Sequence, residues 1–181
     1  MIVLAADTQL DQNQIKFGIK SAYPFQRFLK QIEIADEIAV WYPWYYITLS
    51  VEMDTFLKKG MFYRDLVAVD GLRPICERLQ CYPERTKSDV TKGVCLQSKA
   101  TKKVASEEAV DLVKGIVLSR NKLLKRHKIT VEKVEMVYHK TFVVQLNNRP
   151  AEDWLYIDSH FDTATTLKLR PEVRKYIEEN V

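Results

Sequence analysis

Three side chains that could do chemistry lie at alternate positions of one short segment: Asp158, His160 and Asp162. Carboxylate oxygens and imidazole nitrogens can hold a divalent metal, and a histidine beside carboxylates can act as a general base. The same residue types are also common in turns at the end of a strand. No second pair of ligands with a known spacing accompanies them, so we expect no bound metal or other cofactor. An enzyme centred on these three residues stays open as an alternative.

The chain has three cysteines, Cys76, Cys81 and Cys95, and no two of them are separated by two residues. An odd number without that spacing argues against both a disulfide framework and a zinc module, so we expect free, partly buried thiols. Glycine-rich nucleotide loops and the common hydrolase and metalloprotease motifs are also absent from the sequence. These absences exclude the commonest enzyme classes and favour a protein that is not a catalyst.

The middle of the chain is its basic part. Residues 84–128 contain twelve Lys or Arg and five Asp or Glu, in a chain of 181 residues whose net charge is only +4. A cluster of cations can attract a phosphate backbone, but cations at the end of a helix also suit the helix dipole. We therefore expect no more than weak association with nucleic acid. The candidate anion-binding residues are Lys122, Lys125, Arg126 and Lys128.

Five aromatic residues within six positions are the most unusual feature of the chain. Successive side chains of a strand point to opposite faces, so these aromatics cannot all face one side. One interpretation is an exposed contact surface for a protein, a peptide or a second copy of the chain, with Pro43 interrupting the ladder of hydrogen bonds. The other is a strand that is covered on both faces. The candidate interface residues are Trp41, Tyr42, Trp44, Tyr45 and Tyr46.

Hydrophobic periodicity and turn residues predict the elements that must position these groups. Ser106 is the expected N-cap of the central helix, because Glu107 and Glu108 suit its first turn. The expected helices cover residues 24–35, 107–126 and 171–179. The expected strands cover residues 2–4, 15–19, 38–51, 62–69, 75–81, 94–96, 131–138, 141–146, 154–157 and 165–169. Asp70 and Gly71 are expected to form a turn at the end of the strand 62–69.

The order of these elements is similar in the two halves of the chain. Residues 65–70 and 153–158 both begin and end with aspartate and have apolar residues at the same inner positions. We therefore predict an α+β fold of two helix-plus-antiparallel-sheet units that arose by duplication. The units are residues 1–83 and 106–181, joined by a basic loop or linker at 84–105 within one compact body. In element order alone, each unit resembles the cystatin-like and propeptide-inhibitor modules, and no residue role is carried over from them.

Composition sets the limits of the functional hypothesis. Hydrophobic residues make up 46% of the chain and charged residues 29%, which is normal for a globular protein. The first apolar stretch is cut short by Asp7, and the most apolar later stretch is too short to span a bilayer, so we expect a cytoplasmic protein. The sequence does not identify a function. The leading hypothesis is a non-catalytic binding or regulatory protein that uses the aromatic surface for a partner or for homodimer formation.

Overall fold

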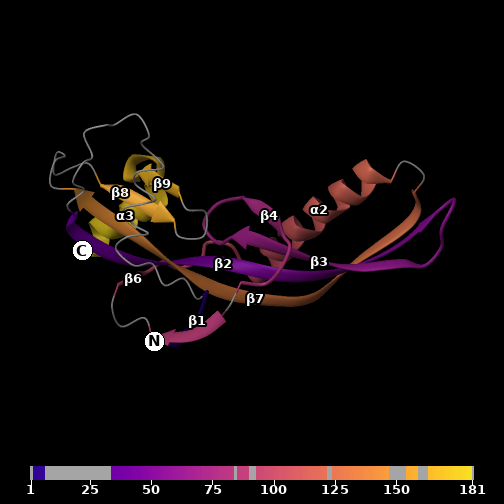
Figure 1. Ribbon diagram of the computed structural model, residues 1–181, viewed down its shortest axis with the longest axis horizontal. Helices are drawn as coiled ribbons and strands as arrows, with labels where there is room; N and C mark the ends of the chain where they lie inside the picture. Colours follow the sequence, from indigo (N-terminus) through magenta and orange to yellow (C-terminus); the bar gives the residue numbers. More distant parts are fainter. Residues whose placement is uncertain are drawn as a thin grey trace. The chain divides into compact units, whose positions relative to one another are not determined.

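A computed structural model of the chain describes residues 2–6, 34–83, 85–89, 93–121, 124–146, 154–158 and 163–180. Its elements form a mixed, α+β fold in which most strand pairs are antiparallel (Figure 1). The helices are α2 (Lys102–Arg120), the 3-10 turn η1 (Leu167–Leu169) and α3 (Pro171–Asn180). The strands are β1 (Ile2–Ala6), β2 (Ile34–Thr55), β3 (Met61–Asp70), β4 (Cys76–Leu79), β5 (Arg85–Asp89), β6 (Val94–Cys95), β7 (Leu124–Leu146), β8 (Leu155–Asp158) and β9 (Thr163–Thr166).

The chain divides into two compact units that are interleaved in the sequence. Unit 1 takes its residues from Met1–Tyr42, Glu84–Leu96 and Tyr138–Val181, and unit 2 from Pro43–Pro83 and Gln97–Val137. Strands β2 and β7 contribute residues to both units. The expected division into residues 1–83 and 106–181 stays a prediction. The segment 84–105 contains β5, β6 and the first turn of α2, and β6 lies within the short strand expected at 94–96. The duplication of the two halves stays a prediction.

Unit 2 is built around the hairpin of β2 and β3. These strands pair antiparallel from Trp44 opposite Asp70 to Met53 opposite Met61, and β4 continues the sheet beyond β3. Alternate residues of β2 face the helix α2, because Tyr45, Ile47, Leu49 and Val51 form one core cluster with four small side chains of that helix. The helix residues are Ala105, Ala109, Val113 and Val117. Their spacing of four places them in one row, and their small size lets the helix lie close to the sheet.

The strands of unit 1 pair around the outer parts of β2 and β7. The strand β8 pairs antiparallel with β7 and then with β9, while β6 pairs parallel with β2 at Val40 and Trp41. One core cluster of this unit contains Phe142, Val144 and Leu146 of β7 together with Leu155, Ile157 and Ala164. Strand β1 pairs with β5 and, through Ala5, with Tyr138 of β7.

The five candidate interface aromatics are all buried, which fits the interpretation of a strand covered on both faces and contradicts that of an exposed contact surface. In unit 1, Trp41 packs with Tyr138 and Cys95, and the ring of Tyr42 meets that of Tyr156 edge-on at 6.3 Å. In unit 2, the hydroxyl of Tyr45 donates a hydrogen bond of 2.9 Å to the carbonyl of Ala100. The other two buried aromatics are Trp44 and Tyr46. The ring centroid of Tyr46 lies 6.2 Å from that of Tyr82.

Pro43 does not break β2, which continues through it as one strand of 22 residues. Proline lacks an N–H, but the carbonyl of Pro43 still accepts a hydrogen bond of 3.0 Å from the N–H of Gly71. A side chain at Gly71 would meet this carbonyl oxygen at 2.8 Å, so the turn after β3 needs a glycine for close packing. The expected turn at Asp70 and Gly71 is confirmed, because Asp70 Oδ1 accepts hydrogen bonds from the N–H groups of Leu72 and Arg73.

The central helix begins earlier than expected. Its N-cap is Thr101, whose hydroxyl accepts a hydrogen bond of 3.3 Å from the N–H of Val104. Ser106 lies inside the helix and donates back to the carbonyl of Lys102. The earlier start buries Ala105 against the sheet. This burial stabilises the helix more than placing Glu107 and Glu108 in its first turn would. The helix then ends at Arg120, because Leu124 already belongs to β7 and packs against the core cluster of unit 2.

Several other expected elements are confirmed with changed bounds, including β1, β3, β4, β8 and α3. The two strands expected at residues 131–138 and 141–146 are one strand, β7. The helix and strand expected within residues 15–33 lie outside the described residues, and Ile34 and Ala35 belong to β2. No helix in the described part of the chain is long and apolar enough to cross a membrane.

Replacing a buried aromatic of β2 tests its role in the core. We expect Trp44→Ala to lower the free energy of unfolding by about 3–5 kcal/mol, because the lost side chain leaves a cavity. Urea denaturation followed by far-ultraviolet circular dichroism measures this change. The control is Leu118→Ala on the exposed face of α2, which we expect to change stability by no more than about 0.5 kcal/mol. A loss at position 44 as small as that of the control contradicts a core role.

The start of the helix can be tested in the same way. We expect Thr101→Ala to cost about 1 kcal/mol, because the N–H of Val104 loses its capping oxygen. Ser106→Ala should be close to neutral, since alanine favours a helix interior more than serine does. Thermal denaturation of both variants decides between the two caps, and a greater loss at Ser106 would show that the helix begins there.

Candidate functional site

The three residues of the candidate metal or catalytic segment are not seen together. Asp158 ends β8 and is buried, whereas His160 and Asp162 lie outside the described residues. Burial, and then the nearby charge of Asp158, raises the pKa of Tyr156 well above its usual value, so this phenol stays protonated. Within the described ranges, no three His, Cys, Asp or Glu side chains are grouped so that they could hold a metal ion.

The cysteines are free, as expected, and two of them are partly buried. Burial and, to a smaller extent, the carboxylate of Glu108 together raise the pKa of Cys76 to about 11, and the Glu108 oxygen lies 3.7 Å from the sulfur. Burial also raises the pKa of Cys95. Because the thiolate is the reactive form, these two side chains are poor nucleophiles at neutral pH. Cys81 is exposed.

A different surface has the features of a contact site, and we name it the hairpin end. It consists of the β2–β3 turn, residues 54–60, and the first residues of β7, residues 125–128. The turn is closed by Thr55, whose N–H donates a hydrogen bond of 2.7 Å to the carbonyl of Lys58 and whose hydroxyl accepts one of 2.9 Å from the N–H of Lys58. Gly60 follows with a φ of +66°, a left-handed conformation that few other residues adopt easily.

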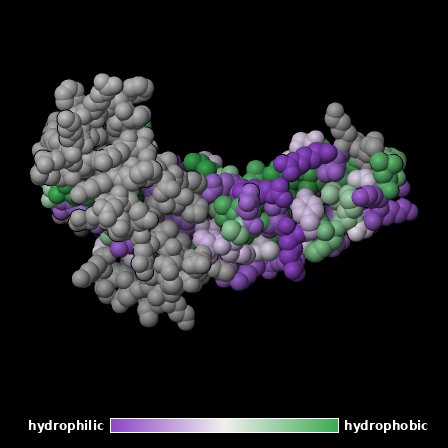
Figure 2. Space-filling model, viewed as in Figure 1, coloured by the Kyte–Doolittle hydropathy of each residue, from purple (hydrophilic) through white to green (hydrophobic). Residues whose placement is uncertain are grey.

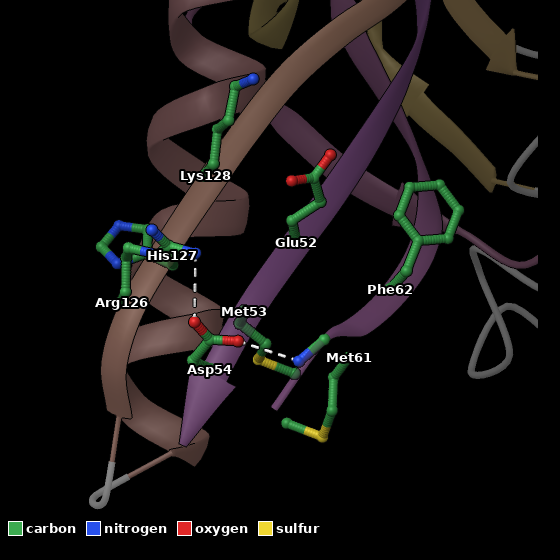
Figure 3. Close-up of a pocket in the computed structure, with 9 residues that line it drawn as sticks. Glu52, Met53, Asp54, Met61, Phe62, Arg126, His127 and Lys128 are labelled. Atoms are coloured by element: carbon green, nitrogen blue, oxygen red, sulfur yellow. Dashed lines mark hydrogen bonds and ion pairs between the residues drawn. The ribbon is translucent and has the colours of Figure 1, made fainter. Parts of the chain in front are cut away.

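Asp54 joins the two parts of the hairpin end. Its Oδ1 accepts a hydrogen bond of 2.8 Å from the N–H of Gly60, and its Oδ2 lies 3.2 Å from a guanidinium nitrogen of Arg126 (Figure 3). The hydrogen bond from Gly60 lowers the pKa of Asp54, and the positive charges of Arg126 and Lys59 lower it further. The carboxylate is therefore ionised at neutral pH and holds the base of the turn beside β7.

A pocket of about 480 Å³ lies beside this carboxylate. Figure 3 shows Glu52 and Asp54 reaching it from β2, Met61 and Phe62 from β3, and Arg126 to Lys128 from β7. The pocket combines both signs of charge with thioether and aromatic surface. That combination suits an amphipathic partner better than it suits a bare anion.

The candidate anion-binding residues were expected at the end of the central helix, and those that are described lie elsewhere. Lys125, Arg126 and Lys128 lie on the strand β7 and not at the end of a helix, because α2 stops at Arg120. All three are exposed, and Arg126 is paired with Asp54. Lys122 lies outside the described residues. These basic residues therefore lie beside the hairpin turn, whereas the prediction placed them at the end of a helix.

Sequence reasoning missed the tip of the turn. Phe56 is 73% exposed and Leu57 82% exposed, and they occupy the two central positions of the turn. The signal was present, since two large apolar residues followed by Lys58, Lys59 and Gly60 lie between two strong strand patterns. A connection between hairpin strands runs over the surface, so apolar residues there do not belong to a core.

A second pocket, of about 640 Å³, lies beside β3 and β4 in the same unit. It contains the buried carboxylate of Asp65, whose Oδ1 is paired with the guanidinium of Arg78. The hydroxyls of Thr48 and Tyr82 are hydrogen-bonded to each other at its wall. Among described residues, Asp65 Oδ2 has no hydrogen-bond partner. This arrangement can accept one more hydrogen bond, but its charges are already balanced by the ion pair.

The chain was also compared with known proteins. It matches no protein-family model, no curated protein and no solved structure. The function of the chain is therefore inferred from the geometry of its own side chains.

The role of Asp54 predicts a pH dependence. A carboxylate whose pKa is lower in the folded state than its unfolded value of 3.8 stabilises the fold above that value, and the contribution is lost as pH falls through the folded pKa. We expect the stability difference between the wild type and Asp54→Asn to be constant at neutral pH and to shrink below pH 3.8. Amide hydrogen exchange should show Gly60 less protected in the variant.

The matched control is Glu52→Gln, which removes a charge from the same pocket. It should leave the exchange of the Gly60 amide unchanged. A difference between the wild type and Asp54→Asn that grows on acidification would contradict the assigned hydrogen bonds.

Proposed function

We propose that the protein is a non-catalytic binding protein that contacts its partner through the hairpin end. The observation that carries the proposal is the exposure of Phe56 and Leu57 at the tip of a turn whose shape is fixed by Thr55. A large apolar side chain gains about 1.5–3 kcal/mol when it leaves water, so two adjacent ones at a fixed tip favour association. The fixed turn also lowers the entropy lost on binding.

This proposal moves the contact surface away from the aromatic run. Those five side chains already pack inside the chain, so they offer no surface to a partner in this structure. The hypothesis of a binding or regulatory protein is kept, and only its site changes. Self-association and a cytoplasmic location stay predictions.

An enzymatic role has less support in the described residues. The pKa values of Cys76 and Cys95 are raised, which makes both thiols poor nucleophiles. The carboxylate of Asp65 forms an ion pair with Arg78. Of the alternative site at Asp158, His160 and Asp162, only Asp158 belongs to the described residues, and its side chain is buried.

Photo-crosslinking in cells tests the proposed contact surface. The full chain would carry the photoreactive amino acid benzoylphenylalanine in place of Phe56, and in a separate variant in place of Leu118 on α2. Both positions are exposed and apolar, so they differ mainly in location. We expect several times more adduct at position 56. Digestion of the adducts with protease, nuclease or lipase then gives the class of the partner.

Equal adduct yields at the two positions would overturn the proposal, because a contact surface must be occupied more often than an ordinary exposed side chain. Circular dichroism of both variants would confirm that the fold is kept.

A further inference from the structure

The tip of the hairpin end is apolar, and the residues behind it are basic. Lys58 and Lys59 follow Phe56 and Leu57 directly in the turn, and both are exposed. The ion pair between Asp54 and Arg126 brings the start of β7 to the base of the same turn. Lys125 and Lys128 are exposed beside it. Figure 2 shows hydrophobic and hydrophilic surface side by side at this end of unit 2, at the right of the view.

Along the strands β2 and β3, unpaired cations stop a short way behind the tip. Glu52 lies in the pocket beside the turn, and Arg64 on β3 is neutralised by Glu132 of β7 at 2.9 Å. Strands rise about 3.3 Å per residue, so the excess positive charge is confined to the last few residues of the hairpin. A nucleic-acid backbone would need cations that continue along the strands, where these acids lie.

The small size of the tip argues against an ordinary protein partner. A stable protein interface buries about 800 Å² on each side. An aromatic side chain buries only about 150–250 Å², so one Phe and one Leu supply a small part of that area. A lipid bilayer does not require a matching surface, since its interface accepts a narrow apolar tip together with cations at the level of the headgroups.

We infer that the hairpin end binds an anionic bilayer surface, with Phe56 and Leu57 inserted among the lipid chains and Lys58, Lys59, Lys125 and Lys128 against the headgroups. This inference depends on the proposed function, because it names the partner of the same surface. Each cation is attracted to an anionic surface, and each inserted apolar side chain adds the free energy of its removal from water. Asp54 and Arg126 fix the relative positions of the two sets.

Vesicle co-sedimentation of the full chain tests the inference. We expect binding to vesicles of phosphatidylcholine mixed with phosphatidylserine, no binding to phosphatidylcholine alone, and weaker binding as salt rises. Phe56→Ser combined with Leu57→Ser should weaken binding by about tenfold or more, given the apolar area that it removes. Leu118→Ser, at an exposed apolar position of α2, should leave binding unchanged.

A charge reversal gives the second comparison. Lys58→Glu combined with Lys59→Glu should abolish binding to the anionic vesicles. Lys102→Glu combined with Lys103→Glu changes the net charge equally, also at two adjacent exposed lysines, and should have little effect. If the two pairs act alike, net charge and not the hairpin end drives the binding, and the inference is wrong.

Other outcomes separate this inference from the proposed function. Crosslinking at position 56 without vesicle binding would overturn the lipid partner and keep the contact surface. Tighter binding of duplex DNA than of anionic vesicles, lost in the Phe56 and Leu57 double variant, would replace the bilayer by nucleic acid. Dimer formation that is lost in the same variant, measured by sedimentation velocity, would replace it by a second copy of the chain.

Discussion

Burial of β2 on both faces is the constraint on which the rest of the structure depends. Between Val40 and Val51, every described side chain except Thr48 is buried. Such a strand needs a cover on each face. In unit 2 the row of small residues on α2 covers one face, and the ring of Tyr82 packs against Tyr46 on the other. Its buried backbone and polar atoms need partners as well. The contacts of Pro43 with Gly71 and of Tyr45 with Ala100 meet that need, and they fix the chain that leads into α2.

The same constraint explains where the hairpin end begins. The continuous burial of β2 stops at Glu52, which is exposed, and the strand then extends to Thr55 with part of its surface in water. Beyond the core, the turn is held by polar contacts of Thr55 and Asp54 and not by packing. The two apolar side chains at its tip therefore contribute little to the fold, which leaves them available for association.

Much of the fold could be predicted from local sequence. The aromatic and β-branched residues of 38–51 predicted a strand, the aspartate and glycine at 70 and 71 predicted a turn, and Pro171 predicted the start of α3. These signals act over a few residues, so no tertiary information is needed. The start of α2 could not be read in this way, because it depends on the burial of Ala105 against strands that are far away in the sequence.

The candidate site was harder to predict for the same reason. Whether Trp44 or Tyr46 is core or surface depends on what covers the second face of β2, and the sequence does not show that Tyr82 returns to it. The basic residues Arg126 and Lys128 could be recognised in the sequence. The predicted helix was too long, because it ran to residue 126, so the prediction placed these residues beside the wrong element. The ion pair of Asp54 with Arg126 and the pairing of β7 with β2 place the basic residues beside the turn.

The interleaving of the two units has a consequence for how the protein can fold and change. The chain passes from one unit to the other after Tyr42, Pro83, Leu96 and Val137. A single cut within 84–96 would leave each fragment with part of both cores, so neither fragment would be an autonomous folding unit. Distant stretches must meet before either core closes, and this loop closure favours slow folding. Genetic recombination by one crossover could not transfer either unit to another protein, so the two units are expected to be inherited together.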